Sequence, residues 1–181
     1  MKYYSAALIF LTVTFSIFLC ALVGFYPAAL VAPARNSGLK PHIIWARSVR
    51  RVSQTTLIYY ERAFGNASST FAITPLTINE VKSKSVEALI NQTFIADAAR
   101  RAATDAEIQI FIEEKLARSN TAPHFKTAVS LLYGLDSAGF IELIARPEAE
   151  KEMLQKKKGW DDAALEHWLA EEKRRAKIVK F

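Results

Sequence analysis

The sequence predicts an all-α protein in which an N-terminal transmembrane helix precedes a small multi-helix domain. No charged side chain occurs between Ala6 and Ala34, and the run Ala6–Val23 is almost wholly apolar. Gly and Pro are scarce, with six of each, so the chain has few residues that stop a helix. From Thr77 onward, apolar residues recur at the three- and four-residue spacing of a helix with one buried side.

The first 32 residues are predicted to anchor the chain in a membrane. About 20 apolar residues in a helix cross the hydrocarbon core of a bilayer, and a helix satisfies its own backbone polar groups there. Tyr3, Tyr4, Phe25 and Tyr26 flank the apolar run, as aromatic residues do at membrane interfaces. We therefore expect a single-pass anchor over residues 1–32.

Two other interpretations of this segment are weaker. Ala32-Pro33-Ala34 offers a signal-peptidase site, but the apolar run before it exceeds the roughly 7–15 residues of a cleaved signal peptide. Cys20 follows the bulky Leu19, whereas a lipidated cysteine follows a small residue, so an apolar thiol inside the membrane helix is the better interpretation.

The charges flanking the anchor predict a cytoplasmic body. Lys2 and the amino terminus are the only positive charges before the span. Five basic residues follow it within a short distance: Arg35, Lys40, Arg47, Arg50 and Arg51. Because positive flanks stay on the cytoplasmic side, this asymmetry alone places the C-terminal domain in the cytoplasm.

The composition of the body excludes several classes of function. The only cysteine lies in the predicted span, so the body has no disulfide framework and no cysteine metal site. The net charge of +6 is concentrated in Arg35–Arg62 and Lys173–Lys180. No nucleic-acid motif accompanies this positive charge. Solvated helix faces, or attraction to anionic lipid headgroups, therefore explain the charge better than nucleic-acid binding does.

Residues 33–41 are predicted to form a linker, and residues 42–181 the helical domain. His42–Phe64 is expected to be helical from about Val52, after a short apolar piece at His42–Trp45 that is the one strand-like pattern in the chain. Residues 65–76 are rich in Ser, Thr and Ala and predict an irregular connection.

The helix Thr77–Ala103 is the clearest in the chain. Thr77 with Glu80 three residues later is a capping box, and Thr104 with Glu107 predicts the start of a second helix in the same way. The first helix carries one apolar stripe, formed by Val81, Val86, Leu89, Ile90, Phe94, Ile95 and Ala98.

Three further helices follow. Pro123–Tyr133 is expected to end at Gly134, and Asp136 to cap a segment that Pro147 starts or kinks and Gly159 ends. Asp161 and Asp162 then open a last helix, Ala163–Ile178.

The residues that carry most enzyme chemistry do not occur in recognisable patterns. His42, His124 and His167 lack second ligands at metal-site spacing, and no phosphate-binding or nucleophile-elbow motif is present. We therefore expect no enzyme activity, no cofactor and no metal.

Several stretches of the body resemble the N-terminal domain of SurA-like periplasmic chaperones. They are Val86–Gln92, Ala98–Arg101, Thr104–Ile108, Leu132–Asp136 with Phe140, and Arg146–Glu148. The resemblance covers Pro41–Lys177. It implies a helical, chaperone-like module outside the cytoplasm that clasps unfolded or translocated polypeptides. No parvulin signature follows, so isomerase activity is not implied.

The resemblance therefore implies the opposite membrane orientation from the flanking charges, and we take the orientation that it implies. Candidate side chains for a polypeptide-binding cleft are the large aromatic ones: Trp45, Phe111, Phe125, Tyr133, Phe140 and Trp168. The alternative is a structural or adaptor protein that binds a partner through its basic C-terminal helix. A detached, amphipathic Ala163–Ile178 helix would favour that alternative. The sequence does not determine the oligomeric state.

Overall fold

The computed structural model describes residues 26–34, 39–64, 77–120 and 124–181. The helices are α2 (Ala46–Phe64), α3 (Ile78–Ala102), α4 (Asp105–Asn120), α5 (Phe125–Tyr133), α6 (Ser137–Phe140), α7 (Arg146–Lys158) and α8 (Asp162–Arg175), with the π-helical turn Ile141–Ala145 between α6 and α7. The strands are β1 (Pro27–Ala32), β2 (His42–Trp45) and β3 (Lys177–Lys180). The chain is thus mostly helical, as predicted.

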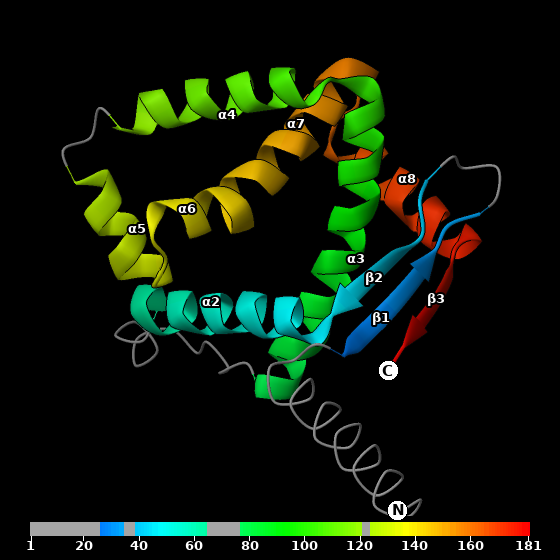
Figure 1. The fold of residues 1–181 in the computed structure, drawn as a ribbon, viewed down its shortest axis with the longest axis horizontal. Helices are drawn as coiled ribbons and strands as arrows, with labels where there is room; N and C mark the ends of the chain where they lie inside the picture. Colours follow the sequence, from blue (N-terminus) through cyan, green and yellow to red (C-terminus); the bar gives the residue numbers. More distant parts are fainter. Residues whose placement is uncertain (1–25, 35–38, 65–76, 121–123) are drawn as a thin grey trace, which may run out of the picture.

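The helices α2, α3, α4 and α5 form the four sides of a frame, and the segment from α6 to α7 runs diagonally inside it (Figure 1). The long helix α3 is central because it packs along α7 and α2. Small side chains on α3 allow this close approach, and Ala99 is fully buried. The core around them includes Ile90, Phe94 and Leu154, which expose at most 1% of their surface.

The capping residues predicted from the sequence begin and end the helices as expected. Thr77 and Glu80 form the reciprocal bonds of a capping box, and Thr104 and Glu107 form the same pair of bonds at the start of α4. Each such cap stabilises its helix by about 1 kcal/mol. Gly134 ends α5 in the left-handed conformation, with φ of 65°.

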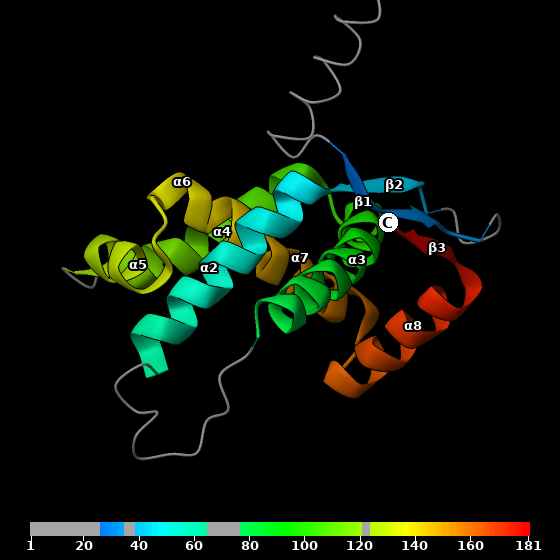
Figure 2. The ribbon, with the colours of Figure 1, turned by 90° about the horizontal axis from the view of Figure 1, so that it is seen from below.

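A three-stranded antiparallel sheet is the feature that the all-α prediction missed. Its strand order is β2-β1-β3, so the first and last strands of the described chain lie side by side. Pairs such as Leu30 with Ile43 and Leu30 with Val179 define the register. Figure 2 shows α3 and α8 on one side of this sheet.

Two predicted boundaries are therefore wrong. Pro27–Ala32 is a strand rather than the end of a membrane helix, and its apolar residues continue the N-terminal apolar run so closely that the sequence shows no break. The last helix ends at Arg175, and Lys177–Lys180 is a strand because β-branched Ile178 and Val179 pair with β1.

The start of α2 also differs from the prediction. The helix begins at Ala46, directly after β2, rather than near Val52. The predicted linker 33–41 contributes a tertiary contact, because the Lys40 backbone N–H donates to an Asp97 carboxylate oxygen at 2.9 Å.

Most of the predicted membrane anchor, residues 1–25, lies outside the described residues. Within the described ranges, no single helix has the length and apolar character needed to cross a membrane. The bent pair formed by Phe125–Tyr133 and Ser137–Lys158 meets those criteria on length and composition alone.

Candidate functional site

Three of the six predicted binding residues come together where α5 and α6 meet α2. The Phe125 and Phe140 rings lie 5.6 Å apart in an edge-to-face arrangement, and the Tyr133 ring lies 5.8 Å from that of Phe140. Tyr59 on α2 stacks on Tyr133 with ring centroids 5.0 Å apart. We call Tyr59, Phe125, Tyr133 and Phe140 the aromatic cluster.

A small apolar pocket opens beside this cluster, between α4 and the α5–α6 turn. Its volume is about 80 Å³, which corresponds to roughly three waters at about 30 Å³ each. The lining residues are Leu116, Phe125, Lys126, Val129, Ser137, Phe140 and Ile141. The pocket therefore matches one aliphatic or small aromatic side chain, with a lysine at its edge.

Hydrogen bonds hold the α5–α6 turn in place. Arg62 of α2 donates to the backbone carbonyls of Ser130 and Leu131 at 3.0 and 2.6 Å. These carbonyls lie at the C-terminal end of α5, where a positive charge is favourable. The Asp136 carboxylate accepts a bond from the Gly139 backbone N–H at 2.7 Å and caps α6.

The other three predicted residues lie elsewhere. Phe111 on α4 is half-buried against the core, with the Lys115 ammonium 5.2 Å from its ring centre. Trp168 packs against Trp160 with ring centres 5.5 Å apart. Trp45 lies at the end of β2 and is 42% exposed. The six residues therefore do not line one shared cleft.

Trp160 and Trp168 line a second, open pocket of about 300 Å³. Glu172 also lines it, and the Oε2 atom of Glu172 is buried with no hydrogen-bond partner in the described part of the chain. Arg101 and Lys158 complete the polar lining, so this pocket carries both signs of charge.

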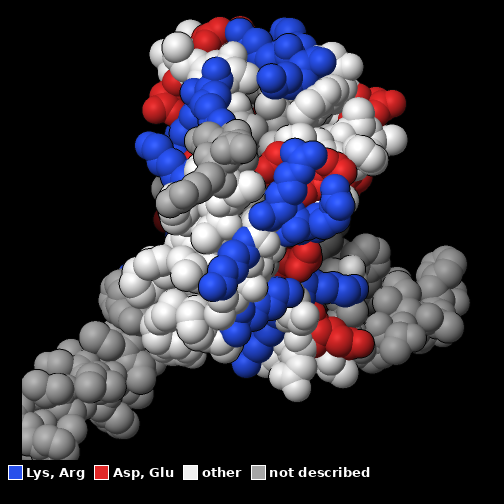
Figure 3. Space-filling view, turned by 90° about the vertical axis from the view of Figure 1, so that its right-hand side faces the viewer, with Lys and Arg blue, Asp and Glu red and all other residues white. Residues whose placement is uncertain are grey.

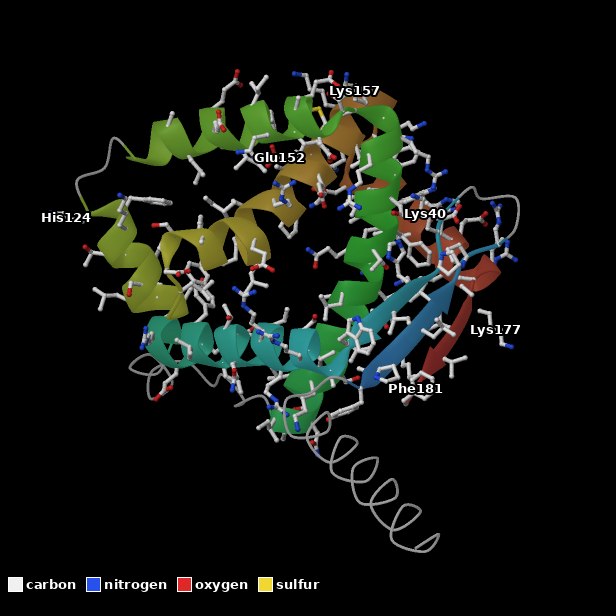
Figure 4. The ribbon with its side chains drawn as sticks, in the orientation of Figure 1. Lys40, His124, Glu152, Lys157, Lys177 and Phe181 are labelled. Carbon is white, nitrogen blue, oxygen red and sulfur yellow. The ribbon has the colours of Figure 1, made fainter. Side chains whose placement is uncertain are left out.

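A third pocket of about 360 Å³ lies at the end of the sheet. It combines apolar side chains, among them Tyr26 and Phe181, with the cations Arg50, Lys82 and Lys180. Figure 4 shows that Lys177 and Phe181 mark opposite ends of β3, with Phe181 at the end facing away from α8. Sequence reasoning missed this groove because it depends on pairing between the two termini of the body.

Two buried carboxylates on α3 and α7 have shifted pKa values. Asp97 on α3 is 8% exposed and lies 2.9 Å from the His42 Nε2 atom. Burial raises the pKa of Asp97, but the Lys40 N–H, His42 and Arg100 together outweigh it and leave the pKa lowered. Burial raises the pKa of Glu150, which nearby Arg100 and Arg146 only partly counteract.

Ion pairs connect α7 to α4. Lys157 near the end of α7 bonds the Glu107 carboxylate at 2.9 Å, and Lys115 on α4 pairs with Glu152 on α7. Lys157 and Glu152 lie on successive turns of α7 beside α4 in Figure 4. No cluster of three or more His, Cys, Asp or Glu residues suited to a metal occurs in the described ranges.

Comparisons with protein-family models, with curated proteins and with solved structures returned no match for this chain. The resemblance to SurA-like chaperones therefore stays a prediction from the sequence.

Proposed function

We propose that this protein is a membrane-anchored, extracytoplasmic holdase-like module that binds unfolded or translocated polypeptides without enzymatic activity. The observation that supports it most directly is the apolar pocket beside the aromatic cluster. Such a pocket takes side chains by their apolar character and tolerates many sequences, as a chaperone requires.

One exposed apolar side chain on the same helix extends this surface. Leu132 lies three residues after the pocket-lining Val129 and is 37% exposed. Leu131 is 63% exposed but lies on the other side of α5. Exposed apolar groups of this kind mark sites of protein interaction more often than ordinary surface. Helix α5 therefore offers both a pocket and an exposed leucine to a polypeptide.

The size of the pocket predicts weak and transient binding. Full burial of one Leu or Phe side chain contributes about 1.5–3 kcal/mol, whereas a dissociation constant of 1 mM already requires about 4.1 kcal/mol. A client must therefore use more than one contact, and it will dissociate quickly. This behaviour suits a holdase, which has to release its clients.

The adaptor alternative loses its main support. A detached C-terminal helix would favour it, but Leu165 and Leu169 of α8 are buried in the core at 1% and 2% exposure. Lys173 of α8 also pairs with Glu87 of α3 at 3.0 Å. No observation on the described residues favours this second function.

Filling the pocket tests the proposal. Ser137 lines the pocket and is exposed, so Ser137→Phe places a ring in it without removing core atoms. The full chain in lipid nanodiscs should suppress aggregation of a chemically unfolded substrate, and Ser137→Phe should reduce that suppression several-fold. Ser48→Phe at an exposed position on α2 is the matched control and should leave suppression unchanged. Equal suppression by both variants would contradict the assignment of this pocket.

A further inference from the structure

The three-stranded sheet presents apolar side chains on both faces. Ala29, Val31 and Ile44 point to the helices and expose 0%, 0% and 4% of their surface. Residues that alternate with them point the other way, because successive side chains in a strand face opposite sides. Ile43 is 51% exposed and Trp45 is 42% exposed on this outer face.

The outer face continues across all three strands. Leu30 of β1 is opposite both Ile43 of β2 and Val179 of β3, and directly opposed residues lie on the same face. An antiparallel sheet that faces water normally carries polar side chains there. Leu30, Ile43, Trp45 and Val179 therefore form an outer face that is more apolar than the water-facing side of an antiparallel sheet normally is.

Positive charges line a groove at the end of the sheet. Arg50 of α2 and Lys82 of α3 lie there with Tyr26 and Phe181. Lys180 also lines the groove, but it is opposite the inward-facing Ala29 and pairs with Glu87 of α3 at 3.3 Å. Neither Arg50 nor Lys82 forms an ion pair with a carboxylate in the described part of the chain. Figure 3 shows Lys and Arg side chains spread over the side of the molecule that carries the sheet and α8.

The covalent chain brings this face close to the predicted anchor. The apolar run ends at Val23, and Tyr26 directly precedes β1. Four peptide units separate Val23 from Pro27, where β1 begins, and they span at most about 14 Å. If the run Ala6–Val23 crosses a bilayer, β1 starts within that distance of the membrane surface.

We propose that the outer face of the sheet lies against the surface of an anionic lipid bilayer. Ile43 and Trp45 enter the interfacial region, where Trp and Tyr are enriched, and Arg50 and Lys82 contact acidic headgroups. This inference rests on the membrane anchor of the proposed function. It adds that the body is held in one orientation, with α5 displaced sideways from the sheet, as Figure 1 shows.

Anionic bilayers fit this surface better than the other possible occupants. A second copy of the chain would bring the same cations of both copies close together around a two-fold axis, because such an interface uses the same patch on both subunits. Acidic headgroups instead neutralise Arg50 and Lys82, and each cation near such a surface strengthens binding by roughly fivefold.

Depth-dependent fluorescence quenching tests the inference on the full chain. Trp160→Phe with Trp168→Phe leaves Trp45 as the only tryptophan, and Trp45→Phe with Trp160→Phe leaves Trp168. Both variants are reconstituted into phosphatidylcholine vesicles containing phosphatidylglycerol and lipids brominated near the headgroup. We expect strong quenching of Trp45 and little quenching of Trp168.

The possible outcomes are distinguishable. If the chain floats with the vesicles but Trp45 is not quenched, the anchor stands and the docking inference is overturned. If the chain does not float, the anchor itself fails, and with it both the proposed function and this inference. Trp45 emission that depends on protein concentration but not on brominated lipid would show a second copy on this face, and would also overturn the inference.

Charge reversal tests the electrostatic part. Arg50→Glu with Lys82→Glu should lower Trp45 quenching on phosphatidylglycerol vesicles several-fold, to the level seen on pure phosphatidylcholine. The matched control is Lys156→Glu with Lys158→Glu, at two exposed positions on α7. If both double variants reduce quenching equally, net charge rather than this groove attracts the lipid. The proposed orientation of the body on the bilayer is then wrong.

Discussion

Gly134 and Gly159 show how single residues set helix ends, Gly134 beside the aromatic cluster and Gly159 after α7. Both adopt left-handed backbone conformations, with φ of 65° and 67°, and each ends a helix. A Cβ atom at Gly134 would lie 3.1 Å from Ile58 Cδ1 of α2, whereas none of the described atoms lies within 4 Å at Gly159. Gly134 therefore allows both a turn and a close approach.

We expect Gly134→Ala to destabilise the fold more than Gly159→Ala. A left-handed Ala costs about 1–2 kcal/mol at either position. Only Gly134→Ala also displaces Ile58, so its loss of free energy of unfolding should be the larger of the two. Urea unfolding of both variants measures this difference. Equal losses of unfolding free energy would show that Ile58 moves aside at no energetic cost.

Asp97 is the residue that ties the segment before β2 to α3. Replacing it with Asn removes a charged acceptor for the Lys40 N–H and His42, which should cost about 1–3 kcal/mol at neutral pH. Because its folded-state pKa is lowered from 3.8, this stability is present above that value and is lost as pH falls through the lower folded pKa.

The Asp97→Asn difference should therefore shrink in acid, as followed by denaturant unfolding between pH 7 and pH 2. The control Glu114→Gln, at an exposed position on α4, should be neutral throughout. A deficit for Asp97→Asn that stays constant in strong acid would mean that the charge of Asp97 contributes nothing.

At the scale of elements, the helix boundaries follow from local chemistry that the sequence displays. Thr77 and Asp161 cap α3 and α8 through bonds to backbone N–H groups three residues later, as their sequence patterns predict. Of the strands, only β2 matches a local signal, the strand-like pattern His42–Trp45, whereas β1 and β3 could not be predicted in the same way. β2 and β3 are four residues long, and β3 directly continues the amphipathic α8, so only pairing with β1 distinguishes it.

Glu107 links two elements, because it caps α4 and binds Lys157 of α7. The bond from Lys157, followed by those from the Thr104 N–H and hydroxyl, lowers its pKa from 4.5 to about 2. Since a lowered folded-state pKa stabilises the fold only above the unfolded value, this contribution is lost as pH falls from 4.5 toward 2.

A titration of the Glu107 side-chain carboxyl carbon by NMR should give a pKa of about 2. Lys157→Met should move that pKa upward toward 4.5, while the neighbouring Lys156→Met should not. Identical pKa values in wild type and Lys157→Met would contradict the α4–α7 link.

At the scale of the whole molecule, the sequence predicts the helical body but not how its surfaces are grouped. Phe125, Tyr133 and Phe140 come together because two turns bring α5 and α6 onto α2, and those turns are visible as Gly134 and Asp136. Trp45 and Trp168 lie on other surfaces, because their positions depend on sheet pairing and on how α8 docks. No local pattern reports such long-range contacts.

The two proposed surfaces have different roles, one in contacting lipid and the other in binding polypeptides. The outer face of the sheet adjoins the predicted anchor, and the pocket beside the aromatic cluster lies on the opposite side of α3 (Figure 1). A client held at α5 would then stay near the membrane without competing with the lipid contact. This arrangement requires that the body lie outside the cytoplasm, although the charges after the anchor favour the other side.

Membrane topology is thus the measurement on which the account depends most directly. A pair of reporters, one active only outside the cytoplasm and one active only inside it, is fused in turn after Phe181 of the full chain. The account predicts activity of the extracytoplasmic reporter alone. Activity of the cytoplasmic reporter alone would contradict the proposal that this module binds translocated polypeptides.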